Sequence, residues 1–227
     1  MEINEKQLQQ IRQLRLMDEA LMVKCFEDNI ECTELMLHLI MKKPVLQVES
    51  VRPQWRGCSV GLDILAKGTI GRQYSIKVLR GDPPAEERES RKNFPLFDDI
   101  YNPYRSTELY RIYIYEHGVV RKAISREIAC FDGFSDGMLV GCIIRTIHVN
   151  GERQNRSPLG QLMFDFSYTD PSEMNYALLA DRVRYLKESP EGIREMCGVL
   201  EEKWTRMHNK FCKEETTEKV TWVGGVW

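Results

Sequence analysis

The stretch "GLDILAKGTIGRQYSIKVLRGD" (residues 61–82) predicts two β-strands joined by a glycine-containing turn. Each strand carries one charged residue, Asp63 or Lys77, between two aliphatic residues. Because side chains of a strand alternate between its faces, we expect both charged residues on the face opposite the aliphatic ones. A turn centred near Ile70 then places Asp63 and Lys77 opposite each other.

Composition indicates a globular chain with one core, either a single domain or a domain with a helical extension. It has 227 residues, of which 42% are hydrophobic and 29% are charged, and its net charge is −2. This charge balance gives no support for a basic surface that binds nucleic acid. The N-terminus is polar and no apolar run is long enough to span a bilayer, so we expect no membrane segment.

The cysteines and histidines form no known spacing of ligands. Seven cysteines are scattered along the chain without a CxxC pair, and the four histidines have no zinc-type spacing. An odd number of scattered cysteines is typical of a reduced, intracellular protein, and we expect a cytoplasmic location.

Helices are expected first, followed by strands and then by helices again. The first helix is expected over 5–27 with a break near Met17, and the second over 31–43, ending at Pro44. Strands are expected over 45–55, where Pro53 limits pairing, in the two arms of the hairpin, and over 108–116 and 137–151. The acid-rich run after Pro83–Pro84 predicts the start of a further helix.

The C-terminal third has helix-start signals. Asp170, Pro171 and Glu173 stand where an N-cap and first turn are expected, and Ser189 and Pro190 repeat the arrangement. The order of elements predicts an α/β protein, a single domain overall. We expect an α/β core over 1–168, C-terminal helices over 169–213 packed on that core, and a tail over 214–227.

Four stretches resemble one family of proteins: "LRLMDEALMVKCFEDNIECTELMLHLI" (14–40), "GLDILA" (61–66), "GRQYSIKVLRGD" (71–82) and "SPLGQLMFDFSYTDPSEMNYALLADRVRYLKESPEGIREMC" (157–197). The family is that of the PD-(D/E)XK nuclease transposases, or Rpn-like recombination-promoting nucleases, of bacteria. The resemblance implies a restriction-endonuclease-like core, a central mixed sheet flanked by helices. It also implies Mg²⁺ held by a helix acid, a strand Asp and an E-x-K/Q motif, which suits the oxygen ligands that Mg²⁺ prefers.

This chain matches the site residues of the family at some positions and differs from them at others. Asp63 matches the family Asp, and Glu19 lies about where the helix acid falls, with Asp18 as its neighbour and rival. Lys77 stands where the family carries Glu, and Leu79 stands where it carries Gln or Lys. We therefore expect a degenerate site in which Asp63 and Lys77 form an ion pair in place of the metal, and no cofactor. The plainer interpretation is an exposed strand acid, a lysine that protects a strand edge, and ordinary polar helix residues.

Two functions follow from the resemblance. The first is a catalytically inactive protein that binds a partner, most simply a protein, as a regulator, decoy or inhibitor; an inhibitor of a defence nuclease, carried by a phage or mobile element, fits the family. The second is an active Mg²⁺-dependent DNA endonuclease with a relocated ligand, chosen among Glu19, Glu27, Glu49 and Asp82.

Two further features leave alternatives open. The tyrosines and arginines of "YNPYRSTELYRIYIY" (101–115) are compatible with nucleic-acid binding, but strand tyrosines more commonly pack on their own sheet. The tail ends in Trp222 and Trp227, so a homodimer through the C-terminal helix or tail is a third interpretation.

Overall fold

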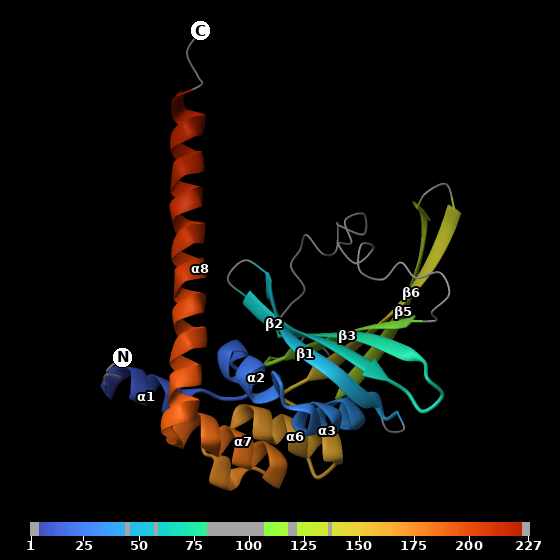
Figure 1. Ribbon diagram of the computed structural model, residues 1–227, viewed down its shortest axis with the longest axis horizontal. Coiled ribbons are helices and arrows are strands. Elements are labelled where there is room, and N and C mark those ends of the chain that lie inside the picture. The colour runs from blue at the N-terminus through green and yellow to red at the C-terminus, as the bar shows by residue number, and fades with distance from the viewer. Residues whose placement is uncertain are drawn as a thin grey trace.

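A computed structural model describes residues 5–43, 46–56, 59–80, 107–117, 122–135 and 138–223. Within these ranges the protein is α/β, with a six-stranded mixed sheet and helices packed on it (Figure 1). The strands are β1 Gln47–Arg56, β2 Ser59–Lys67, β3 Gln73–Arg80, β4 Thr107–Tyr115, β5 Ile124–Ser135 and β6 Met138–Asn150. The helices are α1 Glu5–Gln13, α2 Glu19–Phe26, α3 Ile30–Met41, α6 Pro158–Ser167, α7 Ala177–Glu188 and α8 Pro190–Val223, with a 3₁₀ turn at Pro171–Glu173.

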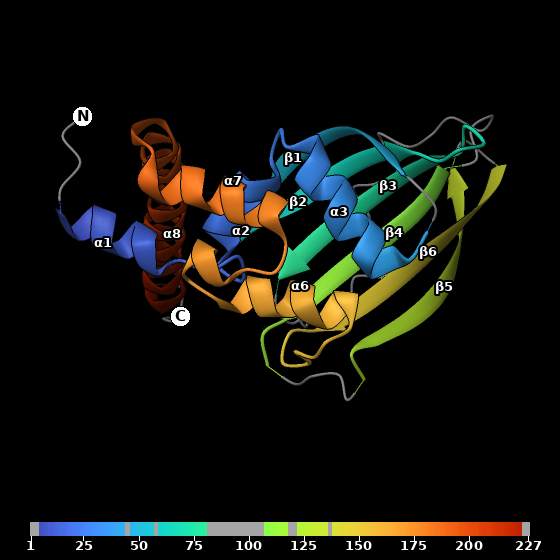
Figure 2. The same ribbon diagram turned by 90° about the horizontal axis from the view of Figure 1, so that it is seen from below.

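The sheet has the order β1-β2-β3-β4-β6-β5. The pairs β1–β2, β2–β3 and β5–β6 are antiparallel, whereas β4 runs parallel to both β3 and β6. Seen from below, α3 and α6 run across one face of this sheet (Figure 2). The coarse prediction of a mixed sheet with helices on it is therefore confirmed; the predicted helix after Pro83–Pro84 lies outside the described residues.

The predicted hairpin is confirmed in its register. Asp63 is the Cα partner of Lys77 in the antiparallel β2–β3 pair. The turn closes where Gly68 N–H donates to the carbonyl of Arg72 at 2.8 Å, and Gly71 adopts a φ of 76°, a conformation that glycine tolerates.

One sequence prediction about the strands was wrong. Pro53 does not limit β1, which pairs with β2 as far as Arg56 opposite Ser59. The reason is that β1 is an edge strand, where a proline can leave its missing N–H on the unpaired side. Strand β5, which the sequence did not predict, begins at Ile124 and pairs with β6 at the other edge.

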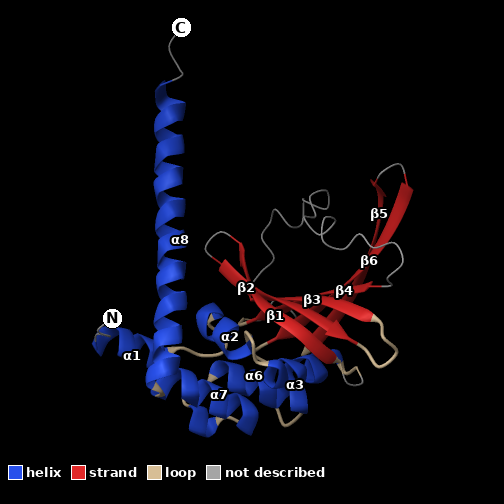
Figure 3. Cartoon of the chain, viewed as in Figure 1, coloured by secondary structure: helices blue, strands red, loops and turns tan. Residues whose placement is uncertain are grey.

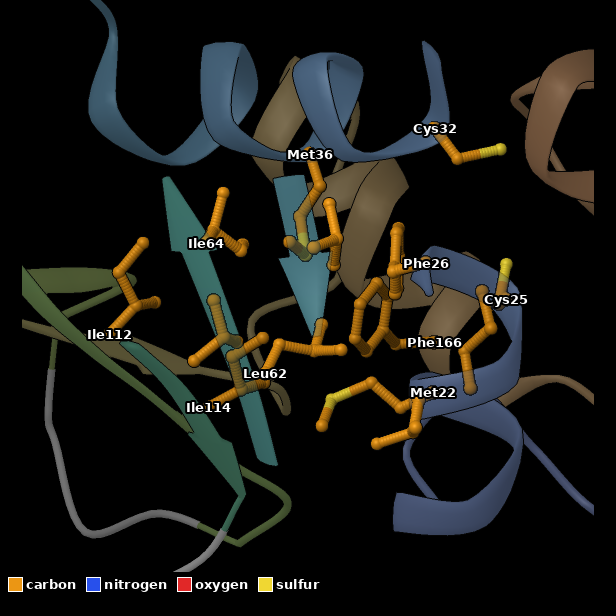
Figure 4. Packing of buried hydrophobic residues seen from close by; sticks show 14 of the residues in the cluster. Met22, Cys25, Phe26, Cys32, Met36, Leu62, Ile64, Ile112, Ile114 and Phe166 are labelled. Atoms are coloured by element: carbon orange, nitrogen blue, oxygen red, sulfur yellow. The ribbon is translucent and has the colours of Figure 1, made fainter. Parts of the chain in front are cut away.

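The core lies between the helices and one face of the sheet. Met22 and Phe26 of α2 meet Phe166 of α6 and the side chains of Leu62 and Ile64 of β2 (Figure 4). The rings of Phe26 and Phe166 stack at a centroid distance of 6.0 Å. Full burial of each such side chain contributes ~1.5–3 kcal/mol, so this contact fixes α2 and α6 on β2.

The first helical segment breaks as predicted, and α2 begins after Asp18. The expected start of a helix at Asp170 was wrong, because only a 3₁₀ turn forms there and α7 begins at Ala177. The buried carboxylate of Asp165 accepts hydrogen bonds from the backbone N–H groups of Asn175 (2.7 Å) and Tyr176 (2.9 Å), which fixes the chain just before α7. The predicted start at Ser189 and Pro190 is confirmed, since Ser189 Oγ accepts from Gly192 N–H at 3.0 Å.

Helix α8 has 34 residues and extends well beyond the other elements (Figures 1 and 3). Its first part is attached to the body by a salt bridge from Lys203 to Glu19 of α2, at 2.7 Å. The guanidinium of Arg206 lies over the ring of Trp55 in β1, 4.6 Å from its centroid. These contacts hold α8 beside the edge strand of the sheet.

Candidate functional site

Asp63 and Lys77 lie on the sheet face opposite the helices. Their neighbours Leu62 and Ile64 point into the core, so alternation along the strands directs Asp63 and Lys77 the other way. The register continues on both sides, with Arg52 of β1 opposite Asp63 and Arg111 of β4 opposite Lys77.

The expected ion pair between Asp63 and Lys77 is not among the ion pairs of the residues that the structure describes, although the two residues are opposite each other. Lys77 is only 7% exposed, and its side chain is not without an interaction. A lysine stem of four carbons lets the ammonium reach a group other than the one directly across the ladder.

Glu19 does not join Asp63. Helix α2 packs on the core side of the sheet, and the Glu19 carboxylate accepts a hydrogen bond from Lys203 Nζ at 2.7 Å. Its neighbour Asp18 instead accepts from the backbone N–H of Arg15 at 2.7 Å. The two helix acids proposed as metal ligands therefore act as local structural groups here.

The other acids considered as relocated ligands are also separate from Asp63. Glu27 pairs with Lys24 in the same helical segment at 2.6 Å, and Glu49 is exposed at an irregularity in β1. Asp82 lies outside the described residues. Over the described ranges, no group of three or more His, Cys, Asp or Glu residues is arranged to hold a metal ion.

A histidine site on the same sheet face was not found from the sequence. The ring of His148 in β6 lies against the rings of both Tyr113 and Tyr115 in β4, with centroids 5.7 and 5.8 Å away, and the two tyrosine centroids are 6.3 Å from each other. Its Nδ1 is 2.8 Å from the Tyr115 hydroxyl, and its Nε2 is 3.6 Å from a Glu127 carboxylate oxygen. Pairing of β4 with β6 creates this group, and such long-range parallel pairing leaves no local pattern in the sequence.

The tyrosines of "YNPYRSTELYRIYIY" that the structure describes serve packing. Tyr110, Tyr113 and Tyr115 are all buried, in agreement with the plainer interpretation. Arg105 lies outside the described residues. A stacking platform for bases needs exposed rings, which these three residues do not provide.

A second charged group lies on the helix-covered face, around Glu108 of β4. Its carboxylate accepts hydrogen bonds from Arg72 (2.5 Å), Lys43 (3.1 Å) and the Tyr110 hydroxyl (2.9 Å), and Arg145 lies at 3.5 Å. We call these five residues the Glu108 cluster. Burial alone would raise the pKa of Glu108, but the hydrogen bonds from Arg72, Tyr110 and Lys43 outweigh it and lower the pKa to about 2.

A surface cleft of about 620 Å³ lies where α2 and α3 approach α7 and α8. Most of its charges are already paired, Lys24 with Glu27 at 2.6 Å and Arg182 with Glu195 at 3.4 Å. The lining residues are Lys24, Glu27, Asp28, Asn29, Ile30, Glu31, Arg182 and Glu195. This cleft therefore offers few unpaired charges to a ligand.

Comparison with known proteins gives no assignment. No protein-family model matches the chain, and neither a curated protein nor a solved structure does. Among the helices that the structure describes, none has the length and apolar character required to cross a membrane.

Proposed function

We propose that this chain is a catalytically inactive protein with a nuclease-like fold that acts by binding a protein partner. The observation that carries the proposal is the one-to-one register of Asp63 with Lys77, a nearly buried lysine. In the family that the sequence resembles, a carboxylate occupies this position and ligates Mg²⁺. An ammonium in its place repels a divalent cation instead of binding it.

The mixed sheet supports the same proposal. Asp63 and Lys77 occupy adjacent strands β2 and β3, as a strand Asp and an E-x-K/Q strand would. Leu79 is two residues after Lys77 and so falls on the same face of β3, where its aliphatic side chain cannot orient a water as the family's Lys or Gln would. The carboxylate that would ligate Mg²⁺ is thus replaced by an ammonium, and the group beside it is replaced by an apolar one.

A protein is the favoured partner for reasons of charge. Affinity for nucleic acid depends largely on neutralising phosphates with Lys and Arg, and the whole chain has a net charge of −2. The role that best fits a scaffold without its metal ligands is that of a regulator, decoy or inhibitor in a bacterial or phage setting.

A second copy of the chain is the alternative partner. Trp204 on α8 is 64% exposed, and α8 extends away from the body (Figure 1). Aromatic residues are common anchors of interfaces. Light scattering coupled to size exclusion, on the full chain and on a chain without residues 214–227, tests this: a dimer that the truncation converts to monomer supports it, and a monomer in both overturns it.

The proposed function is tested directly by metal binding. Isothermal titration of the full chain with Mg²⁺ and with Mn²⁺ should show no specific site, and Asp63→Ala should behave in the same way. The double variant Lys77→Glu, Leu79→Gln restores the family pattern and serves as the matched comparison. Saturable binding by the native chain that Asp63→Ala abolishes would instead support the alternative, a Mg²⁺-dependent endonuclease with a relocated ligand.

A further inference from the structure

The Glu108 cluster has more positive charge than its own contacts neutralise. Among the residues that the structure describes, three cations, Lys43, Arg72 and Arg145, lie around one carboxylate, that of Glu108. The carboxylate is 13% exposed, whereas the Arg72 side chain is 43% exposed. The acid therefore lies beneath the cations, and the unneutralised positive charge is directed to the surface.

The surrounding elements hold these cations in fixed positions. Lys43 Nζ lies 4.5 Å above the centroid of the Tyr74 ring and 4.9 Å above that of Tyr110. The Arg145 guanidinium lies 5.7 Å from the Tyr110 centroid. Cation–π contacts and the shared carboxylate reduce the motion of long side chains, so less entropy is lost when they bind a ligand.

Further cations extend this surface along β5 and the end of α3. Arg126 donates a hydrogen bond from Nη2 to the carbonyl of Ile40, at 3.2 Å, and Ile128, its neighbour two residues on, is the register partner of Arg145. Lys42 is exposed at the end of α3, in the left-handed conformation with φ 53°. The basic surface thus includes groups from α3, the β2–β3 turn, β5 and β6.

We propose that this basic surface is the contact site for an acidic segment of the protein partner. The inference rests on the proposed function, because it specifies the chemistry of that partner. Carboxylates of a bound segment would accept hydrogen bonds from the outer faces of Arg72 and Arg145, as bidentate arginine–carboxylate pairs do. Single-stranded nucleic acid that binds by stacking is disfavoured here, because the Tyr74 and Tyr110 rings are buried under the cations and cannot stack on bases.

The probe for the experiment is a short fluorescein-labelled peptide rich in Asp and Glu, with a Ser-substituted peptide of equal length as reference. Binding is followed by fluorescence anisotropy with the full chain at low and at physiological ionic strength. The test variant is Arg72→Gln, Arg145→Gln. The matched control is Arg184→Gln, Arg194→Gln, which removes the same charge from exposed arginines that pair with Asp181 and Glu191 within their own helices.

We expect saturable binding of the acidic peptide that is ~5-fold weaker in the test variant and unchanged in the control. The variant Glu108→Gln should bind the acidic peptide more tightly than the native chain does. The substitution removes the negative charge beside the three cations, so we expect the affinity to rise ~2- to 5-fold. A melting curve of each variant confirms that it is folded, so a loss of binding is not mistaken for unfolding.

Three results would overturn the proposal: no saturable binding by the native chain, equal binding by the native chain and the test variant, or equal loss in test and control variants. A labelled DNA duplex is run in parallel, and binding of DNA in place of the peptide would assign the surface to nucleic acid. Failure of this experiment leaves the proposed function intact, because metal binding at Asp63 is measured independently of Arg72 and Arg145.

Discussion

Glu108 and Asp63 are both acids in strands of one sheet, and cations from neighbouring strands lie beside each of them. Glu108 accepts hydrogen bonds from two cations and a tyrosine, and its pKa is lowered to about 2. Asp63 is opposite Lys77 in the ladder and forms no ion pair with it within the described side chains. The strand register brings the Cβ atoms of two opposite residues close together. An ion pair forms only where the charged ends of the two side chains also approach each other.

The difference in hydrogen bonding distinguishes an acid that stabilises the fold from an acid that needs a functional explanation. A carboxylate with several convergent donors stabilises the fold, and its removal should affect unfolding. A carboxylate without such donors contributes little to stability, so its position on the sheet face needs another explanation. The resemblance to metal-dependent nucleases offers one, since Asp63 would be the remaining ligand of a lost site.

The largest loss of stability is expected at the carboxylate that accepts hydrogen bonds while fully buried. Asp165 is fully buried and accepts three hydrogen bonds, from Asn175 N, Asn175 Nδ2 and Tyr176 N at 2.7 to 2.9 Å. Asp165→Ala should lower the free energy of unfolding by ~3 kcal/mol, because these donors lose a charged acceptor. Urea denaturation followed by circular dichroism measures this. The matched control Asp170→Ala removes the cap of the exposed 3₁₀ turn and should cost much less than Asp165→Ala; equal losses would contradict the role assigned to Asp165.

Glu108→Ala should have the next largest effect. The substitution leaves Lys43, Arg72 and Arg145 close together without a carboxylate, so we expect a loss of ~2 kcal/mol, given partial screening by solvent. Chemical denaturation at low and high salt measures it, and added salt should reduce the loss. A smaller loss of stability in Glu108→Ala than in Asp63→Asn would contradict the difference drawn between the two acids.

The pH dependence of stability should identify the same carboxylate. The pKa of Glu108 is about 2 in the folded protein and 4.5 as its ordinary value. Its contribution is therefore complete above pH 4.5 and is lost as the pH falls from 4.5 toward 2. The difference in stability between the native chain and Glu108→Gln should shrink over this interval, as urea midpoints at neutral pH and at about pH 3 would show. A constant difference would contradict the assigned cause.

The smallest effect is expected at Asp63. Asp63→Asn keeps the shape of the side chain and removes a charge that has no ion-pair partner among the described residues, so stability should change by less than ~0.5 kcal/mol. A thermal melt of both proteins measures this. A loss comparable to that of Glu108→Ala would show that Asp63 is a structural acid and that its place on the sheet needs no functional explanation.

Local patterns predicted much of the fold. The β2–β3 register followed from alternation on either side of a glycine turn, and the break before α2 and the start of α8 followed from helix signals. The start of α7 was missed because it depends on Asp165, a residue of the preceding helix whose role appears only when α6 and α7 pack together. The residues next to Tyr176 in the sequence do not predict its contact with Asp165, because that contact depends on tertiary packing.

The candidate sites were predicted less completely than the fold. Asp63 opposite Lys77 was predicted, since it depends on one hairpin. The His148 site and the Glu108 cluster were not, because each needs the parallel pairing of β4 with β6 and residues far apart in the chain. The ion pair expected between Asp63 and Lys77 is not among the ion pairs of the described residues, because register fixes the backbones and does not by itself bring the ends of long side chains together.

Cleavage of supercoiled plasmid by the purified full chain, in Mg²⁺ and in Mn²⁺ with Asp63→Ala in parallel, would decide whether the chain is the inactive nuclease-like protein proposed above. We expect no cleavage by either protein, because Lys77 and Leu79 stand where the proposed metal site would need a carboxylate and a Lys or Gln. Cleavage by the native chain that Asp63→Ala abolishes would contradict the account and identify an active nuclease with a relocated ligand.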